Sequence, residues 1–332
     1  MEHRIEISAF GGPEGMQWVP TELPPPGPGE VRLRHTAVGL NYIDTYHRRG
    51  LYPVPLPAPL GVEGAGVVEA VGPGVSDFAP GDRACTFGPL PGSYATARNL
   101  PAAQLLHTPA TVNDELAATA LLKGCTAEFL VERCARVEPG ESVLVHAAAG
   151  GVGLLLVQWL RHLGARVIGT VSTPEKAALA HAAGAEAVIV TQTPWQGLTG
   201  PAAIAPQVRA LTGGAGVRVS FDGVGMDTWE ASLDSTARCG LIVSYGNASA
   251  PVSGVALGVL AAKGSLFVTR PTLYDYYREP AERAAGAERM FALFAAGVLE
   301  VTIGQRFALA EAAEAHRALE GRRTVGSTLL VP

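Results

Sequence analysis

The sequence predicts an α/β protein with a doubly wound parallel sheet in one domain and a second, mostly β domain. Strand-like and helix-like segments alternate from Glu141 to Thr269, which predicts βαβ units with right-handed crossovers. Before Thr111, alternating polar and apolar stretches are separated by Gly and Pro turns, a pattern typical of a small barrel-like β domain. The length of 332 residues exceeds what one core usually supports, so we expect two domains.

The first part of the chain consists of short predicted strands joined by stiff turns. Arg4–Ile7 and Val31–Val38 alternate polar with apolar side chains, which predicts half-exposed strands. Between them, residues 24–30 (PPPGPGE) form a turn-rich connector. Gly64–Gly72 is predicted to be a buried strand. Two amphipathic helices are expected next, at Asp114–Leu122 and Thr126–Ala135.

The second part alternates strand and helix. Thr173 and Pro174 mark the clearest helix start, because Thr is a good N-cap and Pro fits the first helical position. Residues 191–206 are rich in Pro, Gly and Thr and predict a surface loop. A β-like tail, Ser327–Val331, is expected to rejoin the first domain. The predicted strands are Glu141–His146, Arg166–Thr170, Ala187–Val190, Val217–Phe221, Leu241–Tyr245 and Ser265–Thr269, and the predicted helices are Leu154–Leu163, Pro174–Ala183, one that ends at Leu211, and Ala281–Ala296.

Composition favours a cytoplasmic enzyme. A hydrophobic content of 48% and a charged content of 17% allow a sizeable core. The net charge of −5 argues against a nucleic-acid partner, which would need a basic face. The start of the chain lacks the apolar core of a signal peptide, and no apolar stretch is long enough to span a membrane. The four cysteines are too far apart for a disulfide framework or a zinc site.

A glycine turn between a strand and an apolar helix points to a dinucleotide. Residues 147–153 (AAAGGVG) follow the predicted strand that ends at His146. A Cβ at Gly150 or Gly153 would obstruct either the approach of a pyrophosphate or the packing of helix on strand. Ala148 stands where the G-x-G-x-x-G pattern has its first glycine, so an ordinary strand-to-helix turn is the alternative. The βα units around the turn favour a Rossmann domain with the phosphates at the helix start.

The end of the following strand indicates which dinucleotide. An NAD site places Asp or Glu about 20 residues beyond the glycines, to hold the ribose 2′-hydroxyl. Residues 169–172 (GTVS) contain no acid, whereas Ser172, Thr173 and Lys176 offer hydroxyls and a cation that suit a 2′-phosphate. We therefore expect NADPH. Glu175, early in the helix, complements the helix dipole, and a solvated position is the alternative for Lys176.

The first domain offers no donor set for zinc. Residues 39–44 and 61–64 contain neither Cys nor His. His35, His47 and His107 lack partners at ligand spacing. We therefore expect no metal.

Several segments resemble the medium-chain dehydrogenase/reductase superfamily: residues 39–46 (GLNYIDTY), 50–53 (GLYP), 61–66 (GVEGAG) and 81–83 (GDR). Residues 122–127 (LKGCTA), 146–153 (HAAAGGVG), 243–247 (VSYGN) and 268–271 (VTRP) are similar to its zinc-free quinone oxidoreductase (ζ-crystallin-like) branch. In the zinc-dependent branch, a Cys stands near Asn41 and a His follows Gly61, where this chain has Val62. The resemblance runs from about Arg4 to Pro332.

The resemblance implies two domains, the cofactor in the cleft and usually a homodimer. A GroES-like, β-barrel-type catalytic domain would comprise residues 1–124 and 267–332, and a Rossmann NADPH-binding domain would comprise residues 125–266. The implied activity is one-electron or two-electron reduction of a quinone, or of another small electrophile, by NADPH. Two alternatives stay open: reduction of an alkenal or enone double bond by NADPH, and a non-catalytic, crystallin-like NADPH-binding protein.

The resemblance also implies roles for single residues. Asn41 and Tyr46 would be the polar pair beside the nicotinamide and substrate, and in the absence of zinc they are the best donors to the acceptor carbonyl. Tyr52 would line the entrance to the same substrate site. For Tyr46 and Tyr52, packing of the domain wall is the alternative. The implied cofactor-binding residues are Asn41, Lys123, Thr126, Gly150, Gly151, Val152, Ser172, Lys176, Tyr245, Asn247, Arg270 and Arg322.

These residues are expected along the whole cofactor. Thr126 would contact the nicotinamide end, the glycine turn the pyrophosphate, and Ser172 and Lys176 the 2′-phosphate. Tyr245 and Asn247 would close the cleft, and Arg270 and Arg322 would hold the nicotinamide ribose or the pyrophosphate, with a solvated charge as the alternative for Arg322. One departure concerns Thr191, because relatives usually carry a Tyr there, so selectivity for NADPH over NADH is expected to be weaker than in the family.

Overall fold

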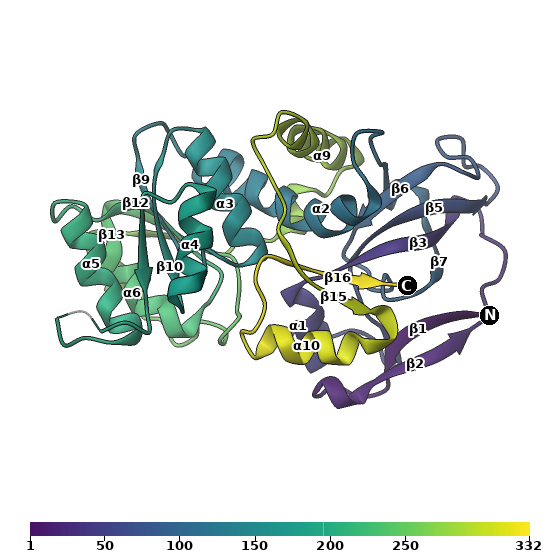
Figure 1. The fold of residues 1–332 in the computed structure, drawn as a ribbon, viewed down its shortest axis with the longest axis horizontal. Helices are drawn as coiled ribbons and strands as arrows, with labels where there is room; N and C mark the ends of the chain where they lie inside the picture. Colours follow the sequence, from purple (N-terminus) through teal and green to yellow (C-terminus); the bar gives the residue numbers. More distant parts are fainter. Residues whose placement is uncertain (195) are drawn as a thin grey trace. The chain divides into compact units, whose positions relative to one another are not determined.

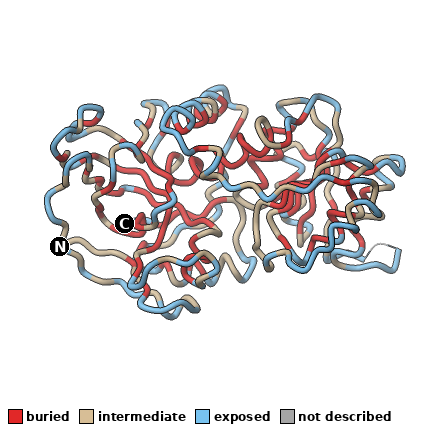
Figure 2. The backbone as a smooth tube through the Cα atoms, turned by 180° about the vertical axis from the view of Figure 1, so that it is seen from behind, coloured by how far each residue is buried: buried red, intermediate tan, exposed pale blue. Residues whose placement is uncertain are grey.

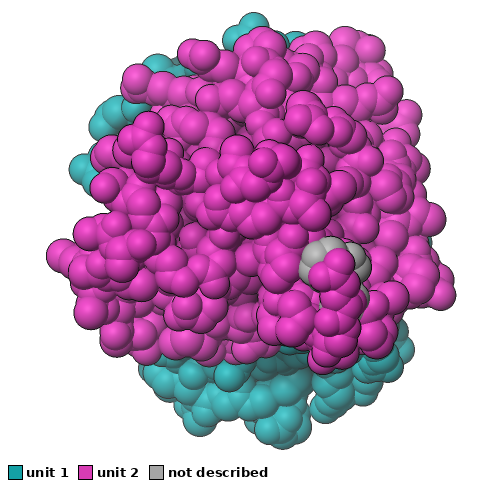
Figure 3. Space-filling view, turned by 90° about the vertical axis from the view of Figure 1, so that its left-hand side faces the viewer, with its two compact units in different colours: residues 1–123, 277–295, 301–332 teal, residues 124–276, 296–300 magenta. Residues whose placement is uncertain are grey.

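The computed structural model describes residues 1–194 and 196–332, and its contacts divide the chain into two units (Figures 1 and 3). Unit 1 comprises Met1–Lys123, Tyr277–Ala295 and Val301–Pro332, and unit 2 comprises Gly124–Tyr276 and Ala296–Glu300. Residues 124, 267–276 and 296–300, which we expected in the first domain, lie in unit 2. The predicted loop at residues 191–206 includes Trp195, which lies outside the described residues.

Unit 1 contains a three-stranded sheet of order β2-β1-β4 and a larger sheet of order β15-β16-β3-β5-β6-β8, with β7 paired to β3. The tail strand β16 lies between β15 and β3, and Leu330 pairs with Val38. The tail therefore rejoins the first part of the chain, as the sequence suggests. The strands are β1 (Glu2–Ile7), β2 (Met16–Thr21), β3 (Glu30–Leu40), β4 (Ala58–Pro59), β5 (Glu63–Val71), β6 (Arg83–Phe87), β7 (Ala97–Pro101), β8 (Leu105–His107), β15 (Ile303–Ala308) and β16 (Ser327–Val331).

The helix α1 (Tyr42–Arg49) follows β3 directly and was not predicted. Asn41 precedes it in an extended conformation (φ −128°), and the carboxylate of Asp44 accepts a hydrogen bond from the Asn41 N–H at 2.9 Å. Gly50 ends it with a φ of +77°, which suits glycine. The other helices of unit 1 are η1 (Pro13–Gly15), η2 (Ala102–Gln104), α9 (Pro280–Ala295), η6 (Leu309–Glu311) and α10 (Ala312–Glu320).

The two amphipathic helices predicted at Asp114–Leu122 and Thr126–Ala135 are wrong as separate elements. A single helix, α2 (Asp114–Glu128), runs on into the π-helical segment η3 (Phe129–Ala135). Gly124 does not stop the helix, because it does not take the positive φ that a glycine cap adopts. The residues from Ala117 to Val131 are buried, so packing on all sides replaces an amphipathic pattern.

Unit 2 is a six-stranded parallel sheet of order β11-β10-β9-β12-β13-β14, which confirms the predicted doubly wound fold. Its strands are β9 (Ser142–Val145), β10 (Arg166–Val171), β11 (Ala187–Val190), β12 (Val217–Asp222), β13 (Thr236–Ser244) and β14 (Phe267–Thr269). Its helices are η3, α3 (Gly151–His162), α4 (Pro174–Ala183), η4 (Gly200–Ala203), α5 (Ile204–Leu211), η5 (Met226–Thr228), α6 (Trp229–Ser235), α7 (Gly258–Ala262) and α8 (Leu273–Tyr276), in addition to the end of α2.

Helices cover both faces of this sheet (Figure 1). On one face, Leu144 and Ile168 pack against Ile204 and Val208 of α5 and Ala231 of α6. On the other face lie α3 and α4. The central strands β9, β10 and β12 are therefore largely buried, as the red segments in Figure 2 show, and the strand order reverses between β9 and β12. In such a sheet, ligands bind at the carboxyl ends of the strands next to this reversal.

Candidate functional site

The glycine turn occupies the carboxyl end of β9, beside the reversal of strand order. Gly153 lies within α3, and a Cβ there would stand 2.3 Å from the Ala147 carbonyl oxygen. Gly150 has more room, because its nearest neighbour would lie at 3.2 Å. Gly151 and Val152 are half-exposed at the start of α3, so the first N–H groups of the helix are accessible to an anion.

Ala148 replaces the first glycine of the dinucleotide pattern for a structural reason. A Cβ built on Gly169 of β10 would lie 2.8 Å from the Cβ of Ala148, so one methyl group fills the space between turn and strand. The Ala148 N–H also donates to the Thr170 carbonyl at 2.9 Å. The turn is thus held against β10 by backbone and side chain together.

Hydroxyl groups and one cationic side chain follow the end of β10. Ser172, Thr173 and Lys176 are half-exposed at the start of α4, and the Thr173 hydroxyl accepts from the Lys176 N–H at 3.4 Å. Hydrogen bonds from its own N–H and from the Thr173 hydroxyl lower the pKa of Glu175, which is exposed at this helix start. Thr191 lies next to this end, with its hydroxyl 3.2 Å from the Val171 carbonyl. These side chains can receive a phosphate group.

The segments after β13 and β14 hold three further predicted residues, Tyr245, Asn247 and Arg270, close together. Arg270 donates to the Ser244 carbonyl at 2.9 Å and, with the Asn247 amide in the orientation its surroundings favour, to the Asn247 side-chain oxygen at 3.0 Å. The ring of Tyr245 covers Gly223, where a Cβ would lie 2.8 Å from the ring. Thr126, the remaining predicted residue of unit 2, is buried in α2.

A buried polar network lies directly below the glycine turn. His146, fully buried at the end of β9, is 3.1 Å from the Thr170 hydroxyl and 3.1 Å from the Ser232 hydroxyl. Ser232 and Thr228 donate to Asp222, the last residue of β12. Burial lowers the pKa of His146, so the ring is neutral. The network ties the carboxyl ends of three strands to one another.

In unit 1, aromatic side chains gather on and beside α1. Tyr46 is buried, and its ring lies 5.2 Å from that of Tyr52 in an edge-on contact. Tyr42 lies 5.8 Å from Tyr46. Burial raises the pKa of Tyr42, and the nearby charge of Arg322 opposes this shift. The structure therefore brings Tyr46, Tyr52 and the Arg322 segment to the same helix.

Asn41 and Lys123 meet at one buried carboxylate. Glu63 Oε2 accepts from Asn41 Nδ2 at 2.8 Å and lies 3.1 Å from Lys123 Nζ, while Oε1 accepts from the Leu122 N–H at 2.7 Å. Asn41, Glu63 and Lys123 are at most 5% exposed. A buried ion pair with additional hydrogen bonds holds the Asn41 amide in one orientation.

The contacts of the Glu63 carboxylate also show whether this region could bind zinc. Neither Asn41 nor Val62 is a residue type that binds zinc, and the Glu63 carboxylate already accepts from Asn41 and Lys123. Across residues 1–194 and 196–332, no group of three or more His, Cys, Asp or Glu side chains could hold a metal ion. The donor set of this region does not fit zinc.

The sequence did not reveal Glu63, Asp44, Tyr94 and His316 as members of the site. Asp44 accepts from the Tyr94 hydroxyl at 2.9 Å, and that hydroxyl is 3.1 Å from His316 Nε2. One signal was available for Asp44, because Asn-x-x-Asp is a helix-start pattern. For Tyr94 and His316, which are 222 positions apart, no local pattern exists.

Two family models match the chain. The alcohol dehydrogenase GroES-like domain matches residues 27–131, and the zinc-binding dehydrogenase model matches residues 151–282. None of the helices in the described part of the chain is long and apolar enough to cross a membrane.

Known proteins resemble the chain over its full length. A quinone oxidoreductase of Pseudomonas aeruginosa is 49% identical, with 100% of both chains covered. A 2-haloacrylate reductase of Burkholderia sp. is 44% identical over 98% of each. The crystal structure of Escherichia coli quinone oxidoreductase complexed with NADPH superposes with a TM-score of 0.95 at 43% identity, covering 99% of this chain and 100% of that one.

Proposed function

Because the chain belongs to the quinone oxidoreductase branch of the medium-chain dehydrogenase/reductase superfamily, we propose that it is an NADPH-dependent quinone reductase that acts without zinc. The full-length likeness to curated quinone oxidoreductases carries this proposal. The substrate is a quinone, and the cofactor is NADPH, as in the related complexes. Unit 2 is the NADPH-binding part and unit 1 the catalytic part.

The residues of unit 2 fit NADPH. The turn Gly150–Gly153 and the start of α3 would receive the pyrophosphate. Ser172 and Lys176 would bind the 2′-phosphate, since no carboxylate ends β10 and Glu175 faces its own helix start. Tyr245, Asn247, Arg270 and Thr126 would bind the nicotinamide half. When bound, NADPH supplies hydride to the acceptor.

The residues of unit 1 would bind and polarise the acceptor. Asn41 would donate to the acceptor oxygen with its second amide hydrogen, because the first is used by Glu63. Tyr46 and Tyr52 would contact the flat ring of a quinone, and Arg322 would lie beside the cofactor ribose. Lys123 holds Glu63 and so supports Asn41 from behind.

The test compares quinone reduction with NADPH and with NADH. We expect NADPH oxidation by ortho- or para-quinones, and a loss of most activity in Asn41→Ala. In Lys176→Ala, the Kd for NADPH should rise about 10- to 100-fold, as expected for one charge-assisted hydrogen bond, while the Kd for NADH stays nearly constant. Absence of NADPH oxidation with every quinone would contradict the proposal.

A second candidate reaction is reduction of an activated carbon–carbon double bond. The 2-haloacrylate reductase that resembles this chain at 44% identity favours it. The same cofactor and the same donors would serve, and only the shape of the acceptor differs. Parallel assays with a quinone, an enone and a haloacrylate at equal concentration separate the two candidates by their kcat/KM values.

We further propose a homodimer in the cytoplasm. The edge strand β14 of the parallel sheet exposes Phe267 and Val268, which are 62% and 39% exposed, and Leu257, just before α7, is 78% exposed. A second copy that pairs edge to edge would cover these side chains. The four cysteines, which are free thiols in the structure, suit a reducing compartment.

A further inference from the structure

Asp44 is a buried carboxylate whose two oxygens differ in their surroundings. Oδ2 accepts from the Asn41 N–H at 2.9 Å and from the Tyr94 hydroxyl at 2.9 Å. Oδ1 is also buried, and within the described part of the chain it has no hydrogen-bond partner. When Asp44 takes up a proton, the proton therefore resides on Oδ1, while both donors stay on Oδ2.

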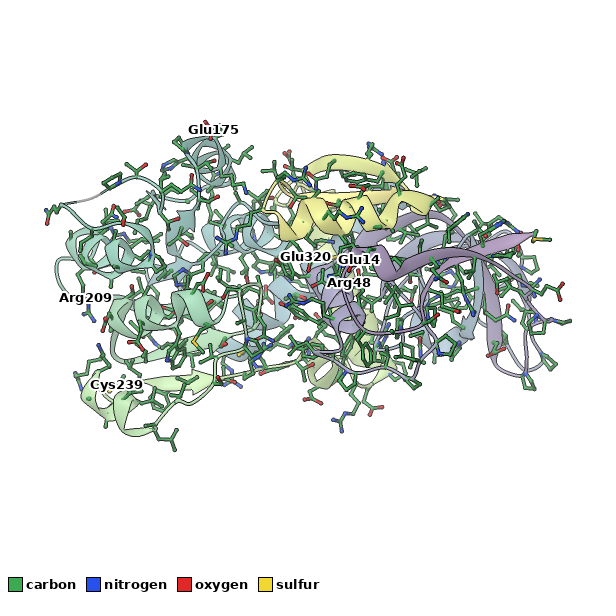
Figure 4. All side chains as sticks on the ribbon, turned by 90° about the horizontal axis from the view of Figure 1, so that it is seen from below. Glu14, Arg48, Glu175, Arg209, Cys239 and Glu320 are labelled. Atoms are coloured by element: carbon green, nitrogen blue, oxygen red, sulfur yellow. The ribbon has the colours of Figure 1, made fainter. Side chains whose placement is uncertain are left out.

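A chain of hydrogen bonds fixes the Tyr94 hydroxyl in its donating role. Arg48 donates from Nη1 to His316 Nδ1 at 3.0 Å, because a guanidinium has no acceptor. The neutral ring then carries its hydrogen on Nε2 and donates to the Tyr94 oxygen at 3.1 Å. Tyr94 is left to donate to Asp44. Arg48 itself is held by both carboxylate oxygens of Glu320, at 2.8 and 2.9 Å (Figure 4).

The charged groups around Asp44 belong to α2, β5 and α10 and to α1 itself. Lys123 of α2 and Glu63 of β5 lie close enough to act on its charge, and they neutralise each other as an ion pair. Arg48 of α1 forms an ion pair with Glu320 of α10, which compensates its charge, and His316 of α10 is neutral. The group Asp44, Glu63 and Lys123 thus carries one net negative charge when Asp44 is ionised, and none when it is protonated.

We propose that Asp44 is a positioning residue for the reaction at Asn41, and that negative charge builds up readily on the bound acceptor only while Asp44 is neutral. The inference rests on the proposed function. A quinone that accepts hydride becomes the hydroquinone anion and then takes one proton from water, while NADPH is left as NADP⁺. Asn41 joins Asp44 through its N–H and Glu63 through its amide, so an ionised Asp44 adds a second carboxylate charge beside the new oxyanion.

Because Asp44 is buried, its protonation state changes near neutral pH. Desolvation raises the pKa of Asp44 to about 7, and the charge of Glu63 adds to the rise. The hydrogen bonds from Asn41 and Tyr94 and the charge of Lys123 act in the opposite direction. Both protonation states of Asp44 are therefore populated in the range where the enzyme would work.

The first experiment measures kcat/KM for a quinone against pH at saturating NADPH. In the wild type we expect a fall of about tenfold per pH unit above pH 7, because only the protonated form reacts well. In Asp44→Asn, which keeps an oxygen acceptor for Asn41 and Tyr94, the alkaline fall should disappear. Asp114→Asn, at a carboxylate elsewhere in unit 1, should keep it. An unchanged alkaline fall in Asp44→Asn would overturn the inference.

The second experiment needs no turnover. Infrared difference spectra of the cofactor-free protein, with Asp44→Asn as reference, follow the carboxyl band of protonated Asp44, which we expect to titrate near pH 7. Tyr94→Phe removes a donor that lowers the pKa, so the midpoints of both the band and kcat/KM should move to higher pH. A titration near pH 4, or a midpoint that Tyr94→Phe leaves in place, would overturn the inference. Failure of the wild type to reduce any quinone would instead contradict the proposed function, and the infrared titration would still report on Asp44.

Discussion

Lys123 and Glu63 form an ion pair whose side chains are only 6% and 0% exposed, so each charge depends on the other. Replacing Lys123 by Met leaves the Glu63 carboxylate buried without its cation. We expect the free energy of unfolding to fall by about 3–5 kcal/mol, measured by urea unfolding. Arg166→Met, which breaks an exposed pair with Glu186, is the control and should change the stability little. An equal effect of the two variants would show that burial does not set the strength of the first pair.

His316 is buried and neutral, and this makes the protein sensitive to acid. Desolvation, followed by the charge of Arg48, lowers the pKa of His316 to about 3. Between pH 6.5 and 3, His316 binds a proton in the unfolded chain but not in the folded protein. The free energy of unfolding therefore falls as the pH falls through this window. In His316→Gln, the loss of stability should be smaller by about 1.4 kcal/mol per pH unit, measured by thermal unfolding from pH 6.5 to 4. Parallel curves for both proteins would contradict this.

At the scale of elements, α3 depends on Gly153. Alanine usually stabilises a helix relative to glycine by about 0.5–1 kcal/mol. Here the added methyl group would lie 2.3 Å from the Ala147 carbonyl oxygen and 2.9 Å from Ala148, so turn or helix must move. We expect Gly153→Ala to lower the thermal midpoint and to weaken NADPH binding. In α7, Gly258 has open space around its Cβ position, so Gly258→Ala is the control and should be neutral or stabilising.

The elements differ in how well the sequence predicts them. α4 and β11 match their predicted bounds, and for α4 Thr173 and Pro174 are the local signals that mark its start. α1 is too short and too crowded with aromatic and β-branched residues to show a helical pattern. The residues of the candidate site also differ in whether the local sequence predicts them. The glycine turn and Lys176 follow from neighbouring residues, whereas the pairing of Glu63 with Lys123 joins positions 60 residues apart and depends on the tertiary fold.

At the scale of the whole molecule, the exposed edge of the parallel sheet predicts association. β14 ends the sheet, and Phe267 is 62% exposed on it. A lysine at this edge would oppose pairing through charge and desolvation. We expect the wild type to sediment as a dimer and Phe267→Lys as a monomer in analytical ultracentrifugation. Leu90→Lys, at a 57% exposed residue of unit 1, is the control and should remain dimeric. A dimeric Phe267→Lys would place the interface elsewhere.

The position of β16 has a consequence for how the chain is made. This strand, Ser327–Val331, lies between β15 and β3 and joins them into one sheet. The main segment of unit 2, by contrast, is complete once residue 276 has emerged. During synthesis the parallel sheet can therefore form first, while the larger sheet of unit 1 can be completed only after β16 has been synthesised. A ribosome stalled before Ser327 should carry a protease-resistant unit 2 and an unprotected unit 1.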